Sequence, residues 1–247
     1  MNLSKKLFEF AFGIGALLAV TGTAAQTSTA NLRASVSIAS DFVQHGLLQT
    51  ESGPTIRVTA DYEHARGFFA GGALTNVEYQ RESDFDNPRD TQATLYVGKS
   101  WNRSSWRTNV TLARYLYPDF ERDYDYTLLS AGISYRDRYF LTASYSSDYF
   151  DIWKRTTNFG AGIALPWIEN IEFSASAGRL NYKGRIASSF SHWNVGLTRP
   201  FGRFAIDLRF HDTSFEPSTV AGNRTRNQWV FSISRALLPL RQAPGMR

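Results

Sequence analysis

The chain has 247 residues, of which 43% are hydrophobic and 15% aromatic, yet its mean hydropathy of −0.32 excludes a bundle of apolar transmembrane helices. It contains no cysteine, which excludes disulfides, thiolate chemistry and cysteine-based metal sites. The net charge is +5, and the basic residues are scattered along the chain rather than clustered, so we expect no nucleic-acid partner.

The N-terminus has the organisation of a secretory signal peptide. Lys5 and Lys6 precede an apolar stretch at residues 7–20, and small residues follow at 21–25. The stretch is too short for a helix that spans a bilayer, which needs about 20 apolar residues. We therefore expect residues 1–25 to be cleaved off during export. The alternative is an uncleaved N-terminal anchor helix.

From Asn31 onward, apolar residues recur at every second position, which is the period of a β-strand with two different faces. In chain order, the segments with this alternation are 33–38, 56–61, 93–98, 106–112, 129–136, 158–165, 171–178, 192–198, 204–211 and 228–234. In the segment 204–211, Phe204 and Phe210 share the apolar face, whereas Asp207, Arg209 and His211 share the other. Two further segments, 67–79 and 138–147, are strand-like without a clear face. The sequence thus predicts about 12 strands, each near the ten or so residues that a tilted membrane strand requires.

Short and long connections alternate between these strands. Short turns are expected at 64–66, 102–104, 137, 166–170 and 200–202, and long polar loops at 43–53, 80–89, 117–123, 148–154, 181–187 and 214–223. Tight periplasmic turns and extended outer loops are typical of a barrel with an even number of strands and both termini in the periplasm.

Lipid offers no hydrogen bonds to the backbone, so strands cross a bilayer only as a closed sheet without free edges. The alternation then places apolar side chains toward lipid and polar ones toward the lumen. We therefore predict an all-β fold, a single antiparallel up-and-down transmembrane β-barrel of about 12 strands with both termini periplasmic. Residues 26–236 would form the barrel and residues 237–247 a C-terminal tail.

Aromatic residues gather near the expected strand ends, as suits rings at the two membrane interfaces. Trp101, Trp106, Tyr135, Tyr139 and Trp167 flank short turns, whereas Tyr115, Tyr117, Tyr124, Tyr126, Tyr145, Tyr149 and Trp153 flank long loops.

The polar face supplies the candidate pore-lining residues. They are Arg33, Arg57, Asp61, Arg107, Asn109, Glu172, His192, Asn194, Asp207, Arg209 and His211. These side chains could line a narrow aqueous path or fill a barrel that plugs itself, because 12 strands fall between small filled barrels and wide porins. The arginines outnumber the carboxylates in this set, which hints at a weak preference for anions.

No catalytic, cofactor-binding or metal-binding residue is predicted. An outer-membrane lipase would need a histidine and a serine at the outer rim facing lipid, whereas His192 and His211 are predicted to point inward, with His45 in a loop and His64 in a turn. The loop carboxylates Glu82, Asp84, Asp86 and Asp90 lack the spacing and central glycine of a calcium-binding EF-hand.

Three motifs resemble those of the TorF-type porin family, formerly catalogued as conserved proteobacterial proteins of unknown function. They are SDFVQHG at 40–46, GFFAGGALTNV at 67–77 and YLYP at 115–118. The chain departs from the family where His45 replaces an arginine and Phe69 a tyrosine, and where residues 236–247 follow the last strand in place of a terminal aromatic. The departure at the C-terminus would move the assembly signal inward, to Trp229, Phe231 and Ile233.

This resemblance implies an outer-membrane location and a porin-like channel for passive diffusion of small hydrophilic solutes, with no defined substrate. The expected partners are outer-membrane lipid and lipopolysaccharide and, during biogenesis, the barrel-assembly machinery and periplasmic chaperones. A non-conducting structural or ligand-binding barrel that acts through loops such as 117–126 and 148–153 is the alternative. A lipid-modifying enzyme is disfavoured.

Overall fold

The computed structural model describes residues 31–50, 53–78, 89–118, 124–150, 155–168, 170–183, 189–215 and 227–240. The predicted signal peptide, residues 1–25, lies outside this part of the chain. Within it, no helix has the length and apolar character needed to cross a membrane.

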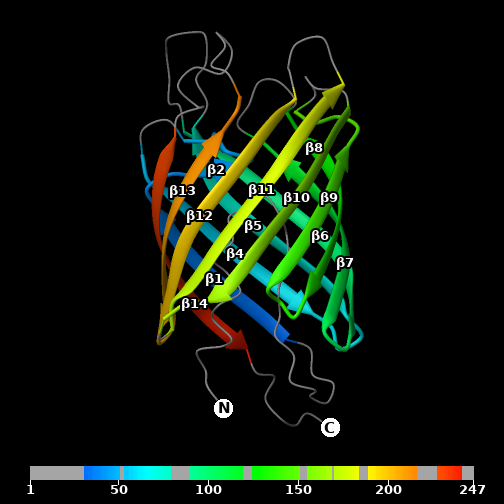
Figure 1. The fold of residues 1–247 in the computed structure, drawn as a ribbon. Helices are drawn as coiled ribbons and strands as arrows, with labels where there is room; N and C mark the ends of the chain where they lie inside the picture. The colour runs from blue at the N-terminus through cyan, green and yellow to red at the C-terminus, as the bar shows by residue number, and fades with distance from the viewer. Residues whose placement is uncertain are drawn as a thin grey trace.

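Twelve strands of the described residues close into one antiparallel barrel (Figure 1), which confirms the predicted barrel and its strand number. These strands are β1 (Asn31–Ala39), β4 (Thr55–Glu63), β5 (Phe68–Glu78), β6 (Arg89–Arg103), β7 (Trp106–Leu116), β8 (Tyr126–Tyr135), β9 (Tyr139–Ser146), β10 (Arg155–Pro166), β11 (Glu172–Lys183), β12 (Phe190–Phe201), β13 (Phe204–Thr213) and β14 (Gln228–Leu240). Each strand pairs with the next one along the chain, and β14 pairs with β1 to complete the circle. The backbone amides therefore find partners within the sheet, as a lipid environment demands.

The five tight connections, at 64–67, 104–105, 136–138, 167–171 and 202–203, each overlap a turn that the sequence predicts, although β6 and β12 run further into two of these turns than expected. Left-handed backbone conformations close several of them, with φ values of 54° at Ser104, 54° at Asp137 and 60° at Gly202. The first strand begins and the last strand ends at this same end of the barrel, since Leu32 lies opposite Leu240 (Figure 1). We call it the short-turn end and the opposite one the long-loop end.

Two strands run further than expected. The pairing of Leu32 with Leu240 carries β14 beyond the expected barrel boundary at Ala236. Similarly, β11 continues to Lys183, into the segment expected to be a loop from Asn181, because Lys183 lies opposite Arg155.

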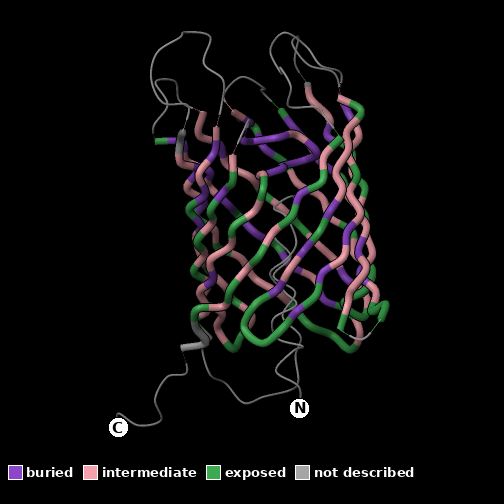
Figure 2. The backbone as a smooth tube through the Cα atoms, turned by 90° about the vertical axis from the view of Figure 1, so that its left-hand side faces the viewer, coloured by how far each residue is buried: buried purple, intermediate pink, exposed green. Residues whose placement is uncertain are grey.

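Exposure alternates along the strands in the sense of a membrane barrel (Figure 2). On β7, Val110 and Leu112 are 42% and 51% exposed, whereas Arg107 and Thr111 are 6% and 1% exposed. The same rule resolves the two ambiguous segments, since Leu74 of β5 and other apolar side chains of β5 and β9 face outward. An apolar outer wall around a polar interior is the reverse of a soluble barrel.

One expectation is wrong: in the segment 43–53, the described residues 43–50 do not extend outward as a loop. After β1 the chain turns into the barrel and forms a small hairpin of β2 (Val43–Gln44) and β3 (Leu47–Leu48). Its side chains are buried, with Gln44 3%, His45 6% and Leu48 9% exposed. Apolar and aromatic groups at the long-loop end of the lumen give this segment a surface to pack against, so burial favours the inward position. We call residues 42–50 the inner hairpin.

Candidate functional site

The predicted pore-lining residues all lie on the inward face of their strands. Arg107, Asn109, Asp207 and Arg209 are buried, and the others of the set are half-buried. The structure brings most of them together in three polar groups, which are set along different parts of the wall.

The first group is centred on Arg209 of β13. Its guanidinium donates to Asn194 Oδ1 at 2.8 Å, to Ser174 Oγ at 2.9 Å and to Asp207 Oδ2 at 2.9 Å. Thr198 donates to the same carboxylate at 2.6 Å. Asp207 and Arg209 are two residues apart on one strand and therefore share a face, and β11 and β12 supply the other partners. Each charge in this buried network is thereby compensated.

The second group lies on β1 and β4 near the short-turn end. Arg33 donates to Glu63 Oε2 at 2.5 Å and stands directly opposite Asp61 in the sheet register. Arg57, four residue pairs further along the sheet, donates to Thr75 Oγ1 at 3.3 Å. Glu63 was missing from the predicted set although it continues the inward row of Arg57 and Asp61. The period of two places Glu63 on this inward row, but Glu63 is the last residue of β4 and comes directly before a turn, where the alternation ends.

The third group surrounds Arg107 of β7. Its Nε donates to Asn102 Oδ1 at 3.0 Å, and its Nη2 lies 3.5 Å from Asp137 Oδ1 in the short turn between β8 and β9. Asn109 follows Arg107 on the same inward row, and Glu172 lies opposite Thr198, beside the first group.

The inner hairpin reaches across the lumen to the far wall. At its tip, His45 Nδ1 shares a hydrogen bond of 3.3 Å with the hydroxyl of Tyr149, and its ring lies 5.4 Å from that of His192 on β12. Gln44 donates to the hydroxyl of Tyr126 at 3.1 Å. Burial, followed by the neighbouring His192, lowers the pKa of His45 to about 3, so its imidazole is neutral at pH 7.

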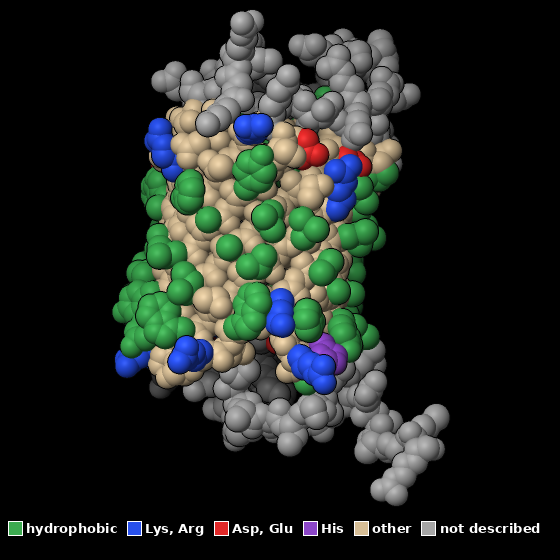
Figure 3. All heavy atoms as spheres, turned by 90° about the vertical axis from the view of Figure 1, so that its right-hand side faces the viewer, with side chains coloured by type: hydrophobic (Ala, Val, Ile, Leu, Met, Phe, Trp, Pro, Cys, Tyr) green, Lys and Arg blue, Asp and Glu red, His purple; other side chains and the backbone are tan. Residues whose placement is uncertain are grey.

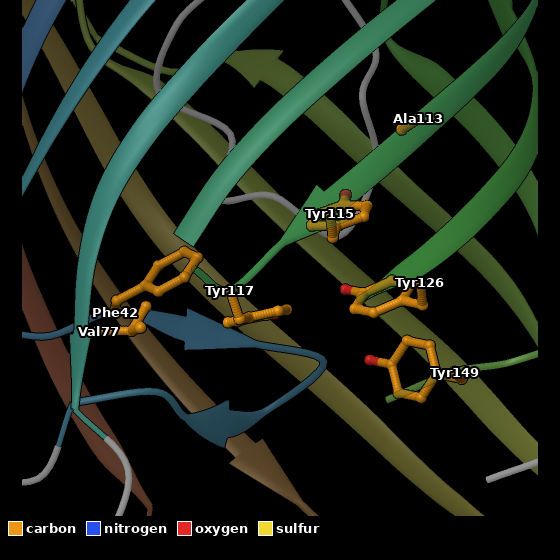
Figure 4. Close-up of a cluster of buried hydrophobic side chains, with 7 residues drawn as sticks. All are labelled: Phe42, Val77, Ala113, Tyr115, Tyr117, Tyr126 and Tyr149. Carbon is orange, nitrogen blue, oxygen red and sulfur yellow. The ribbon is translucent and has the colours of Figure 1, made fainter. Parts of the chain in front are cut away.

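A cluster of buried aromatic rings supports the hairpin from β7, β8 and the segment after β9 (Figure 4). The rings of Tyr115 and Tyr126 stack with centroids 4.5 Å apart, and Tyr126 contacts Tyr149 at 4.6 Å. Phe42 belongs to the same cluster, so the base of the hairpin packs on it. We call this group the tyrosine cluster.

The tyrosine cluster corrects a second expectation. Tyr115, Tyr117, Tyr126 and Tyr149 were assigned to the outer membrane interface, but they are at most 6% exposed and lie inside the barrel. Tyr115 and Tyr126 lie on the inward rows of β7 and β8, which the period of two in the sequence indicates, whereas Tyr117 and Tyr149 lie beyond the strand ends. Of the rings assigned to the short-turn end, Trp101, Trp106, Tyr139 and Trp167 do lie on the outer surface, 48–60% exposed.

Within the described part of the chain, no three His, Asp or Glu side chains are grouped as metal ligands. The loop carboxylates Glu82, Asp84 and Asp86 lie outside the described residues, as does the side chain of Asp90.

A closed twelve-stranded sheet with an apolar exterior and a charged interior has the architecture of outer-membrane β-barrels. Residues 23–237 match the family described as "Bacterial protein of unknown function (Gcw_chp)", and the chain belongs to this family. No curated protein sequence matches it.

Solved structures of outer-membrane channels are similar to this barrel. An outer membrane channel from Pseudomonas putida F1 has a TM-score of 0.53 and 9% identity, over 86% of this chain and 97% of that one. The KdgM porin has a TM-score of 0.51 and 7% identity, over 84% and 98%. A second KdgM structure, in complex with disordered oligogalacturonate, has a TM-score of 0.51 and 8% identity over the same shares. At these identities the similarity concerns the fold.

Proposed function

We propose that this protein is a porin-like channel of the bacterial outer membrane, through which small hydrophilic solutes diffuse passively. The observation that carries the proposal is the closed twelve-stranded barrel with an apolar outer wall and an inner wall of charged and amide side chains. The short turns and both termini would lie in the periplasm, and the long loops outside. A cleaved signal peptide at residues 1–25 would direct export.

Buried polar atoms support a hydrated interior. The hydroxyls of Thr94, Thr111 and Thr156 and the amide oxygens of Gln44 and Gln92 are buried and have no hydrogen-bond partner among the described residues. A buried polar group that lacks any hydrogen bond costs about 1–3 kcal/mol, and water is the partner that ordinarily relieves this cost. These groups lie on β6, β7, β10 and the inner hairpin, so the hydrated region would extend around much of the wall.

The inner hairpin would form the constriction of the channel. It leaves the wall after β1 and contacts β8, β12 and the segment after β9, and thereby narrows the lumen near the long-loop end. Such a constriction would restrict passage to small molecules. KdgM binds an oligogalacturonate, and short sugars are reasonable first solutes to test here.

Selectivity for charge would be weak. Arg33, Arg107 and Arg209 each have a carboxylate within ion-pair distance, from Glu63, Asp137 and Asp207. Paired charges cancel at the distance of a passing ion, so any preference for anions would depend mainly on Arg57. The reversal potential in a salt gradient measures this directly.

We assign no catalytic role. His192 and His211 lie on the inward face, away from lipid. The histidine of a lipid-modifying site would have to face lipid. The proposed partners remain outer-membrane lipid, lipopolysaccharide, the barrel-assembly machinery and periplasmic chaperones.

A non-conducting barrel that binds a ligand through its outer loops is the second candidate. The observation that favours it is that the inner hairpin and the tyrosine cluster together fill the lumen at the long-loop end, which would block the passage of solutes.

Planar-bilayer recordings separate the two candidates. The full chain would be compared with a variant in which residues 43–49 are replaced by a short Gly-Ser linker, after heat-modifiable gel mobility has shown that both are folded. The channel proposal predicts discrete conductance steps for the wild type and larger ones for the variant. Conductance in the variant alone would favour the plugged barrel, and silence of both proteins would overturn the channel proposal.

A further inference from the structure

Basic side chains lie around the outer wall at the short-turn end, and all of them except the half-buried Lys99 are exposed. They are Lys99, Arg103, Arg136, Arg199, Arg203 and Arg235, which lie on or beside strands β6, β8, β12, β13 and β14, and we call them the basic belt. Figure 3 shows such Lys and Arg side chains near this end, among hydrophobic ones. They thus sit where the apolar wall meets water.

Aromatic rings hold several of these cations at the interface. The ammonium of Lys99 lies 4.3 Å from the ring centre of Phe68 and 5.5 Å from that of Trp101. The guanidinium of Arg136 lies 5.1 Å from the ring of Tyr135, and Arg235 covers Phe204 at 5.4 Å. Rings of this kind prefer the depth of lipid headgroups, so the cations are placed at that depth too.

The belt lacks negative partners within the described residues, where none of its members is within ion-pair distance of a carboxylate. The exposed acid Asp137 at this end is within reach of Arg107 instead, and Glu169 lies outside the described residues. At the long-loop end, by contrast, the outward Arg114 lies 3.4 Å from Asp125 and 3.9 Å from Asp148. Within the described residues, the positive charge of the basic belt is therefore not compensated by carboxylates.

We propose that the basic belt binds the phosphate groups of anionic phospholipids in the membrane leaflet at the short-turn end, and so fixes the depth of the barrel in the bilayer. Guanidinium groups match the geometry of phosphate oxygens, and their stacking on rings leaves the N–H edges free to donate. The inference rests on the membrane location proposed above, but not on conduction.

Lipid retention tests the proposal. The purified full chain in detergent would be mixed with phosphatidylglycerol or with phosphatidylethanolamine at low salt, and bound lipids would be counted by native mass spectrometry. The belt variant Arg199→Gln/Arg235→Gln is matched by Arg155→Gln/Arg179→Gln, which removes two exposed arginines from the long-loop end. Each basic side chain near an anionic lipid surface contributes about 1 kcal/mol to the binding free energy, which corresponds to roughly a fivefold change in affinity.

The wild type should retain phosphatidylglycerol in preference to phosphatidylethanolamine, and added salt should remove this preference. The belt variant should lose at least about fivefold in affinity for phosphatidylglycerol, and the matched variant should change little. Equal retention of the two lipids by the wild type, or an equal loss in both variants, would overturn the proposal. Tighter binding of lipopolysaccharide than of phosphatidylglycerol would overturn the choice of ligand.

Two further measurements keep the result interpretable if a variant does not fold or if the channel proposal fails. If the belt variant does not show the gel shift of a folded barrel, the lipid preference of the wild type and the salt dependence of that preference still test whether the protein binds anionic phospholipid. A silent bilayer recording combined with selective lipid retention would reject the channel and keep the belt, so the two proposals fail separately.

Discussion

The ring of His45, at the tip of the inner hairpin, meets the ring of His192 on β12 edge-on, with centroids 5.4 Å apart and an angle of 61° between the planes. His192 also shares a hydrogen bond of 3.2 Å with Asn158 Oδ1, and His45 shares one with Tyr149. Two imidazoles this close and this buried cannot both carry a proton at low cost. Burial, followed by the neighbouring His192, lowers the pKa of His45, so the docked position of the hairpin favours a neutral His45.

Acid should weaken the docking of the inner hairpin. The docked pKa of His45 is about 3, below the value of 6.5 of a free imidazole. The released hairpin thus binds a proton that the docked one does not, and docking loses free energy as the pH falls from about 6.5 toward 3. Hydrogen exchange of the hairpin amides at pH 7 and pH 5, corrected for intrinsic rates, measures this loss.

His45→Asn provides the control for the pH effect. His45 has φ = 52°, and asparagine tolerates this left-handed conformation better than most residues. The pH dependence between 7 and 5 should shrink in this variant. Burial raises the pKa of Asp41, so protonation of Asp41 favours the docked form as the pH falls, and this opposite effect is present in both the wild type and the variant. Unchanged hairpin protection between pH 7 and 5 in the wild type would contradict the role of His45.

Gly46→Ala should release the hairpin tip. A Cβ at Gly46 would lie 2.9 Å from Thr213 Cβ and 3.0 Å from the Asp212 carbonyl oxygen, and the φ of 76° adds about 1 kcal/mol of strain. We expect larger or noisier single-channel conductance and a lower thermal midpoint. Gly53→Ala is the matched control, because a Cβ there meets nothing within 4 Å. Equal conductance and equal thermal midpoints of the two variants would argue against close packing of the hairpin tip on β12 and β13.

Arg209→Met should destabilise the barrel strongly. The change removes the cation from the buried Asp207 carboxylate and leaves Asn194 and Ser174 without their donor. Breaking a buried pair in this way costs about 3–5 kcal/mol, which urea unfolding in lipid vesicles would detect by tryptophan fluorescence. The double variant Asp207→Asn/Arg209→Met should recover part of the loss, since no buried charge is then left unpaired.

Neighbouring positions on β8 distinguish the two faces of the wall. Leu129 is 48% exposed on the outer face near the middle of its strand, so Leu129→Arg should cost about 2–4 kcal/mol or prevent membrane insertion. Ser130 is half-buried on the inward row, opposite Thr111 and Ser144. Ser130→Arg should fold normally and shift the reversal potential toward anions. If both variants folded equally well, the assignment of the outer face to lipid would be wrong.

The sequence by itself determined the barrel, its strand number and the facing of most residues. Lipid contact acts on each residue separately, so every membrane strand must show the period of two that Phe204 to His211 show. The tight turns were readable for a similar reason, because a turn depends on a few adjacent residues. The faces of two segments, on β5 and β9, are not clear from the sequence, and only the folded barrel shows them through strand pairing and exposure.

Only the tertiary structure decided what fills the lumen. The inner hairpin docks through contacts such as Gln44 with Tyr126 and His45 with Tyr149 and His192, which join residues far apart in the chain. The pairing of Arg33 with Glu63 and of Arg107 with Asp137 likewise depends on how the closed sheet brings a strand and a turn together. Periodicity reports which side of a strand a residue occupies, whereas contacts across a lumen depend on the closure of the whole sheet and leave no local pattern.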